Sequence, residues 1–143
     1  MHLRFNILVL FVCIILVKCN SKEKFSYVIP HFDSVISAKK ISINKLAQHY
    51  KSLNGQYIET EGTFFSAFEE FAIYTDKKFF SNERDGFWMD VNNNLFTNQK
   101  DWDSVYARQG TKILIKGKVD TSRHGHLGGY LATITDIYFF KEE

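Results

Sequence analysis

The chain has few of the residues that build disulfide scaffolds and cysteine-ligated metal sites. Its only two cysteines, Cys13 and Cys19, lie near the N-terminus, and Pro30 is its only proline. Residues from position 20 onward therefore contain no thiol, which excludes a disulfide framework or a cysteine-ligated zinc site in that part. The domain must depend on its hydrophobic core, and residues 19–143 are long enough to form one.

The chain also lacks a surplus of either charge. It has 18 basic and 16 acidic residues, and the only charged residues among the first 18 are Arg4 and Lys18. Without that segment, 16 basic residues face 16 acidic ones. Proteins that hold nucleic acid through its phosphates gather Lys and Arg on one face, so this balance argues against nucleic-acid binding.

Long hydrophobic runs are missing except for residues 7–17, which are all apolar. A helix rises about 1.5 Å per residue and the hydrocarbon core of a bilayer is about 30 Å thick, so this run covers roughly half the span. It follows Arg4 and precedes Cys19, as in a secretory signal. We interpret residues 1–18 as an export signal, which places the protein in the cell envelope.

The end of this run, Leu16-Val17-Lys18-Cys19, resembles the lipobox of bacterial lipoproteins. In that family the signal is cut before a cysteine that carries a diacylglyceryl group. The resemblance implies that Cys19 is the lipid-attachment site, with residues 19–24 as a tether to the inner or outer membrane. Lys18 departs from the family pattern, which has Gly, Ala or Ser there. The alternative is an ordinary secretory signal cut elsewhere, but A-x-A-like small residues are missing.

A helix is predicted after an extended arm at residues 25–41. Ser42 is a suitable N-cap, and Asn54-Gly55 provides the residues that end many helices, so the helix is expected at residues 43–53. Its apolar stripe has the spacing of one helical face and consists of Ile43, Leu46, Ala47 and Tyr50. Residues 42–143 are expected to form the domain itself.

Two distant segments alternate with a period of two, as strands do, and place glycine third in the inward-facing series. These are residues 58–64 with Gly62 and residues 113–119 with Gly117. Glycine within a strand indicates a bulge or a sharp bend in a curved sheet. The opposite faces carry complementary charges, so we expect the strands to lie side by side, with Glu59 and Glu61 on one and Lys116 and Lys118 on the other.

Three further strands are predicted at residues 70–75, 86–91 and 129–140, and a short helical connection at residues 97–107. The alternation in the last strand slips at Asp136, as at a bulge. After the slip, the inward face is expected to continue through Ile137 and Phe139.

This order resembles the OB-fold, a five-stranded Greek-key barrel, over residues 43–140. More narrowly, the LNGQYIETEG run at residues 53–62 and the GKVD run at 117–120, with the following HGHLGGY, resemble small uncharacterised OB-type lipoproteins of Gram-negative envelopes. The resemblance implies a mainly β fold, with one N-terminal amphipathic helix and a helical connection between strands three and four. It implies no activity.

OB-folds commonly bind ligands on strands two and three and on the two neighbouring loops. If Phe87 and Met89 face the core, Trp88 stands on the outer surface near Tyr74. The alternative is that the arm, through residues 25–36, covers Trp88. With the hairpin loop between strands four and five, the candidate binding surface comprises Tyr74, Trp88, Arg123, His124, His126 and Tyr130.

His124-Gly125-His126 also suggests a metal site, since two imidazoles two residues apart can face one side. A third ligand is missing and would have to come from elsewhere, for example from Asp120 or Asp136. The alternatives are a glycine-rich hairpin in which these residues support the turn, or direct contact with a ligand.

Catalytic motifs such as G-x-S-x-G, phosphate-binding glycine loops and H-E-x-x-H are missing from the sequence. We therefore expect a non-catalytic, monomeric binding module without a cofactor, held at the membrane by lipid, with an envelope protein as partner. The alternative is an OB domain for nucleic acid or oligosaccharide. A third hypothesis is a metal-binding protein that uses His124 and His126.

Overall fold

A computed structural model of the chain describes residues 25–67, 69–75 and 85–143. The predicted export signal, the tether and Cys19 lie outside these residues. Within the described ranges, no helix combines the length and apolar character that crossing a membrane requires.

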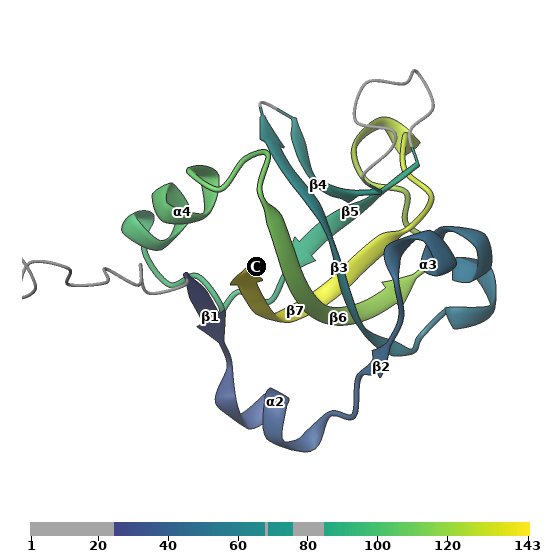
Figure 1. The fold of residues 1–143 in the computed structure, drawn as a ribbon, viewed down its shortest axis with the longest axis horizontal. Coiled ribbons are helices and arrows are strands. Elements are labelled where there is room, and N and C mark those ends of the chain that lie inside the picture. The colour runs from purple at the N-terminus through teal and green to yellow at the C-terminus, as the bar shows by residue number, and fades with distance from the viewer. Residues whose placement is uncertain (1–24, 68, 76–84) are drawn as a thin grey trace, which may run out of the picture.

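The prediction of a mainly β fold is confirmed, because the described chain forms one sheet of seven strands (Figure 1). Five were expected, and the two additional strands come from the arm. The strands are β1 (Ser26–Val28), β2 (Lys39–Lys40), β3 (Tyr57–Ala67), β4 (Glu70–Tyr74), β5 (Gly86–Val91), β6 (Lys112–Asp120) and β7 (Thr133–Glu142). The helical segments are α2 (Pro30–Val35), α3 (Ile43–His49) and α4 (Gln99–Tyr106), with 3-10 turns η1 (Tyr50–Leu53) and η2 (His126–Gly128).

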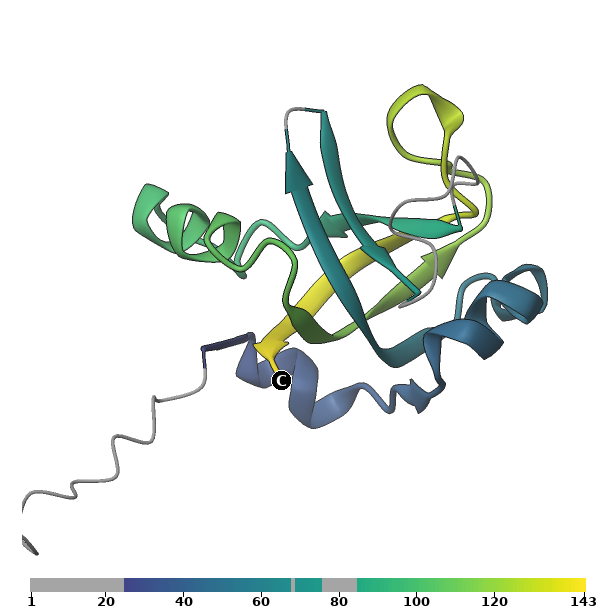
Figure 2. The ribbon, with the colours of Figure 1, turned by 45° about the horizontal axis from the view of Figure 1, so that its top comes forward.

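The pairing of the five longer strands runs in a circle. β3 pairs antiparallel with β4, β4 with β5, and β7 with β6, while β5 and β7 are parallel. β6 then pairs antiparallel with β3, which returns the series to its first strand (Figure 2). The side chains between these strands form the core, and its fully buried members include Phe64, Ile73, Phe87, Ile115, Ile134 and Phe140.

The prediction that the two glycine-containing strands lie side by side is confirmed, because β3 pairs with β6. Glu59 lies directly opposite Lys116, whose Nζ is 3.7 Å from Glu59 Oε2 and 2.7 Å from Asp33 Oδ1. Glu61 and Lys118 lie instead opposite Leu114 and Tyr57. The charge pattern therefore predicted the correct pair of strands, and of its four charged residues only Glu59 and Lys116 lie directly opposite each other.

The helical predictions are confirmed with small changes at the ends. α3 and η1 together cover residues 43–53, and the Ser42 hydroxyl accepts a hydrogen bond from the Lys45 amide at 3.4 Å. Gly55 has a φ of 76°, which is a left-handed conformation that glycine adopts more readily than other residues. α4 occupies most of the predicted connection at residues 97–107.

The segment predicted as an extended arm, residues 25–41, is only partly extended, because it contains a helix between two short strands. β1 pairs with β7 and β2 pairs with β3, so both ends of the arm belong to the sheet. Between them, α2 begins at Pro30, whose fixed φ suits the first turn of a helix. The ring of Phe32 on α2 stacks on Tyr138 with centroids 6.0 Å apart. The arm therefore completes the sheet edge and covers part of β7.

The predicted irregularity in β7 is present, but its consequence differs from the expectation. Asp136 has a φ of 50°, and the register between β6 and β7 shifts between Lys116 and Lys118. Ile137 faces the core as predicted. Phe139 does not, because the irregularity places it opposite Lys116 and puts Phe140 opposite Ile115 inside the core.

Tyr27 of β1 connects the arm to α4. Its hydroxyl donates to Asp101 Oδ1 at 2.7 Å, and its ring packs edge-on against Phe96. The hydrogen bond from Tyr27 is the largest of several that hold the pKa of Asp101 below its ordinary value of 3.8, and the Thr97 amide contributes another.

Replacing Tyr27 by Phe is expected to raise the pKa of Asp101 toward 3.8, because the strongest stabiliser of the carboxylate is lost. A pH titration of the carboxyl carbons by NMR measures this change. Asp120 is the internal control, since Ser122 lowers its pKa independently of Tyr27. A group with a lowered folded-state pKa stabilises the fold above its unfolded pKa, and this contribution is lost as the pH falls. Wild type should therefore lose more stability below about pH 4 than the variant. An unchanged Asp101 titration would contradict the assignment.

Candidate binding site

Trp88 lies on the outer face of the sheet, as predicted. Its neighbours Phe87 and Met89 are in the core, whereas Trp88 stands opposite Ala72 and belongs to a second apolar cluster. The buried members of that cluster are Ala72, Tyr74 and Tyr130, with Phe65 and Trp88 partly buried. The structure thus brings together the three aromatic residues of the predicted surface.

The loop between β6 and β7 covers this cluster. The alternative prediction, in which the arm covers Trp88, is therefore wrong. The ring centroid of Tyr130 lies 5.3 Å from that of Trp88 and 6.5 Å from that of Tyr74. Gly125 passes so close that a Cβ there would lie 2.6 Å from Trp88 Cβ. Tyr74 and Tyr130 are consequently buried, and Trp88 is only partly open.

The three polar candidates hold this loop in place. Arg123 Nη1 donates to Asp90 Oδ2 at 2.7 Å, and His126 Nε2 lies 3.4 Å from Glu69 Oε2. His124 Nδ1 lies 3.0 Å and 3.1 Å from the carbonyl oxygens of Tyr130 and Leu131. Since carbonyl oxygens only accept, His124 donates from Nδ1. These contacts fit the glycine-rich hairpin that the sequence left as one alternative.

The two histidines have different partners, which are backbone carbonyl oxygens for His124 and the Glu69 carboxylate for His126. Within residues 25–67, 69–75 and 85–143, no group of three or more His, Cys, Asp or Glu side chains is placed to hold a metal ion. The spacing of His124 and His126 therefore has a local explanation in loop support.

Replacing Gly125 by Ala is expected to displace the loop from Trp88, because Gly125 has a φ of 63° and the new methyl group would overlap the indole. The indole should become more exposed, and its fluorescence should shift to longer wavelength. The emission is best read in a Trp102→Phe background, which leaves one tryptophan.

Gly128→Ala is the matched control for this change. Its φ of 67° imposes a similar backbone strain, but nothing lies within 4 Å of the added Cβ. An equal emission shift in both variants would show that backbone strain, and not contact with Trp88, governs the loop.

A groove that the sequence did not predict begins at the open side of Trp88. It has a volume of about 350 Å³ and lies between β5, the β3–β4 turn and α4. In Figure 1, α4 stands to one side of the hairpin formed by β3 and β4. The residues that line the groove are Ala67, Glu69, Glu70, Phe71, Trp88, Met89, Asp90, Val91, Trp102 and Tyr106.

Aromatic rings form the α4 side of the groove. The centroids of Trp102 and Tyr106 lie 5.9 Å apart, and Phe71 contacts both rings edge-on at 5.9 Å and 6.4 Å. Tyr106 remains 48% exposed. The i, i+4 spacing of Trp102 and Tyr106 was visible in the sequence, but it predicted only a helical turn and not its partner.

Carboxylates form an acidic part of the rim. The side chains of Glu69 and Asp90 are 54% and 43% exposed. Glu70 accepts a hydrogen bond from the Tyr74 hydroxyl, and burial together with this bond raises the pKa of Tyr74 far above its ordinary value. No Lys or Arg is among the described residues that line the groove, and Arg123 reaches Asp90 from the loop. The site therefore combines open aromatic surface with negative charge.

Comparison of the chain with protein-family models, with curated proteins and with solved structures finds no match.

Proposed function

We propose that this protein is an envelope lipoprotein whose OB-like barrel is a non-catalytic module that binds another envelope protein. The OB-like assignment is supported by the circular pairing of β3, β4, β5, β7 and β6 and by the position of α4 between β5 and β6 in the chain. Fold alone does not define a function, so the proposal depends on the site.

The observation that carries the binding proposal is the aromatic groove beside Trp88. It adjoins β4 and β5 and the turn between β3 and β4, which correspond to the surface that OB-folds commonly use. Open aromatic side chains such as Tyr106 give large contact area at small entropic cost and are frequent in protein interfaces.

The binding proposal is tested by cross-linking the full-length protein to its neighbours in isolated envelopes. Tyr106→Ala should abolish the cross-linked partner that wild type gives, because it removes the open wall of the groove. Leu127→Ala is the matched control, since Leu127 is exposed but lies on η2 and does not line the groove. A partner retained equally by both variants would contradict the proposal. Salt-sensitive binding of single-stranded DNA at the groove would favour the nucleic-acid alternative instead.

The membrane anchor is tested by substitution at Cys19. Cys19→Ser is expected to move the protein from the membrane fraction to the soluble fraction, because burial of acyl chains contributes about 0.8 kcal/mol per CH₂ group. Cys13→Ser is the matched control, as this cysteine lies within the apolar run and should leave attachment unchanged. Continued sedimentation of the Cys19 variant with membranes would contradict lipidation at this residue.

A further inference from the structure

The groove has the chemistry of a receptor for positive charge. The faces of Trp and Tyr rings attract ammonium and guanidinium groups within about 6 Å of the ring centroid. Trp102 and Tyr106 supply such rings to the lining of the groove, and Glu69 and Glu70 supply carboxylates to the same lining. A cation in the groove therefore has both kinds of favourable partner available.

The charged side chains around the groove do not cancel its preference for a cation. Arg123 is held by Asp90, and His126 lies beside the Glu69 carboxylate, with Nε2 at 3.4 Å from Oε2. Glu70 accepts from a neutral tyrosine hydroxyl and receives no positive charge from it. On α4 itself, Lys100 is outnumbered by Asp101 and Asp103. An anion in the groove would meet these carboxylates at short range.

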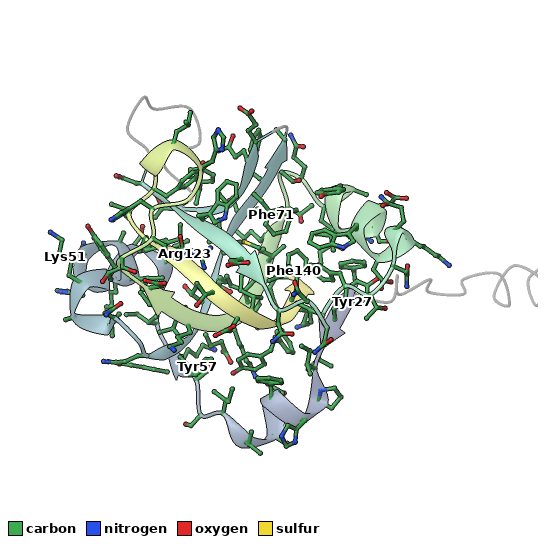
Figure 3. The ribbon with its side chains drawn as sticks, turned by 180° about the vertical axis from the view of Figure 1, so that it is seen from behind. Tyr27, Lys51, Tyr57, Phe71, Arg123 and Phe140 are labelled. Carbon is green, nitrogen blue, oxygen red and sulfur yellow. The ribbon has the colours of Figure 1, made fainter. Side chains whose placement is uncertain are left out.

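Basic residues gather at another part of the molecule. A hollow between β2 and α3 is lined by Lys39, Lys40, Lys45 and His49. Figure 3 shows Lys51, on the adjoining η1, at the side of the molecule opposite to α4. Among the described residues, this basic hollow shares no residue with the groove, whose own lining has three carboxylates and no Lys or Arg. A basic ligand therefore matches the charge of the groove and not that of the hollow.

We infer that the groove receives a basic peptide segment of the partner, with a Lys or Arg side chain between the aromatic wall of α4 and the Glu69–Glu70 rim. This inference rests on the proposed binding function and names the chemistry of its ligand. Arginine suits the site best, because its planar guanidinium can stack on a ring and donate to a carboxylate at the same time.

The chain offers its own reporter for this interaction. Its two tryptophans, Trp88 and Trp102, both line the groove, so ligand binding should change the intrinsic fluorescence. The probes are three blocked nine-residue peptides of Gly and Ser that carry three Arg, three Gln or three Glu residues. They are titrated into the full-length protein in detergent at about 0.15 M salt. The Arg peptide should produce a saturable change, and the Gln and Glu peptides should not at the same concentrations.

Substitutions at the rim test where the peptide binds. Glu69→Gln with Glu70→Gln is expected to weaken binding of the Arg peptide roughly fivefold or more, since each lost charge contributes about twofold to fivefold at a partly exposed site. Glu61→Gln is the matched control for the loss of one charge, because it removes a carboxylate from an exposed position of β3 outside the groove. Glu69→Gln alone provides a second variant, as its side chain is more than half exposed and its loss does not threaten the fold.

The outcomes separate this inference from the proposed function. Equal binding of the Gln or Glu peptide, or an Arg peptide unaffected by the rim variants, would overturn the assignment of a basic ligand. If Tyr106→Ala still abolished the cross-linked partner, the binding function would survive that result. Loss of both the peptide signal and the Tyr106-dependent cross-link would overturn the two together.

Discussion

Replacing Gly62 by Val is expected to lower the free energy of unfolding by about 3 kcal/mol, at the upper end of the usual cost of overpacking. A Cβ at this position would lie 2.7 Å from Ile43 Cδ1 and 2.7 Å from the carbonyl oxygen of Tyr74. The isoleucine side chain can move, but the Tyr74 carbonyl belongs to β4. Relief of the overlap therefore requires a shift of β4 against β3.

Urea unfolding followed by circular dichroism measures this effect, and Glu61→Val is the matched control. Glu61 is the preceding residue of the same strand and is exposed, so valine there keeps the strand preference without overlap. The control should change the unfolding free energy by less than about 0.5 kcal/mol. An equal loss in both variants would show that the close approach of β4 does not constrain Gly62.

Replacing Phe140 by Ala is expected to cost about 3–5 kcal/mol of stability, the range observed for large aromatic deletions in a core. Phe140 is fully buried, and its ring contacts three other rings. The centroid distances are 5.5 Å to Phe64, 5.7 Å to Phe96 and 6.1 Å to Phe25. The substitution removes a ring of β7 that contacts β3, the residue before β1 and the segment before α4.

Phe139→Ala provides the control with the same chemical change at the next position. Phe139 is only partly buried, and the Nζ atom of Lys116 lies 4.8 Å from its ring centroid. Its loss should cost less than about 1.5 kcal/mol, including the cation–π contact. The reverse order of the two costs would mean that the inward face of β7 continues through Phe139, as the alternation in the sequence predicted.

Gly62 and Gly117 show which structural features the sequence pattern could predict. At Gly117 the expected irregularity is present, because the register between β6 and β7 shifts there. At Gly62 the pairing with β6 is regular, and glycine is required by the close approach of α3 and β4. Close approach applies to Gly117 as well, because a Cβ there would lie 2.8 Å from Ile134 Cγ2 and 2.9 Å from the Thr135 carbonyl oxygen. Sequence spacing cannot predict these contacts, since the contacting atoms belong to elements that are distant in the chain.

The candidate site was predicted in part. Alternation along β5 placed Trp88 on the outer face, and turn chemistry placed Arg123, His124 and His126 in a glycine-rich loop. The sequence left open whether Trp88 is exposed or covered by the arm, whereas Gly125 and Tyr130 of the β6–β7 loop cover it in part. The arm instead pairs with β7 and β3, because both strands have edges with free hydrogen-bonding groups.

By itself, the sequence determined the local elements of this protein: a capped helix, five alternating strands and the pairing of two of them through complementary charge. These features depend on periodicity and on short-range backbone preferences, which are written into neighbouring residues. Only the tertiary structure decided that α4 contacts Phe71 of β4 and that Trp102, Tyr106, Glu69 and Glu70 line one groove. Such contacts join segments whose separation in the chain carries no periodic signal, so they follow from packing of the whole sheet.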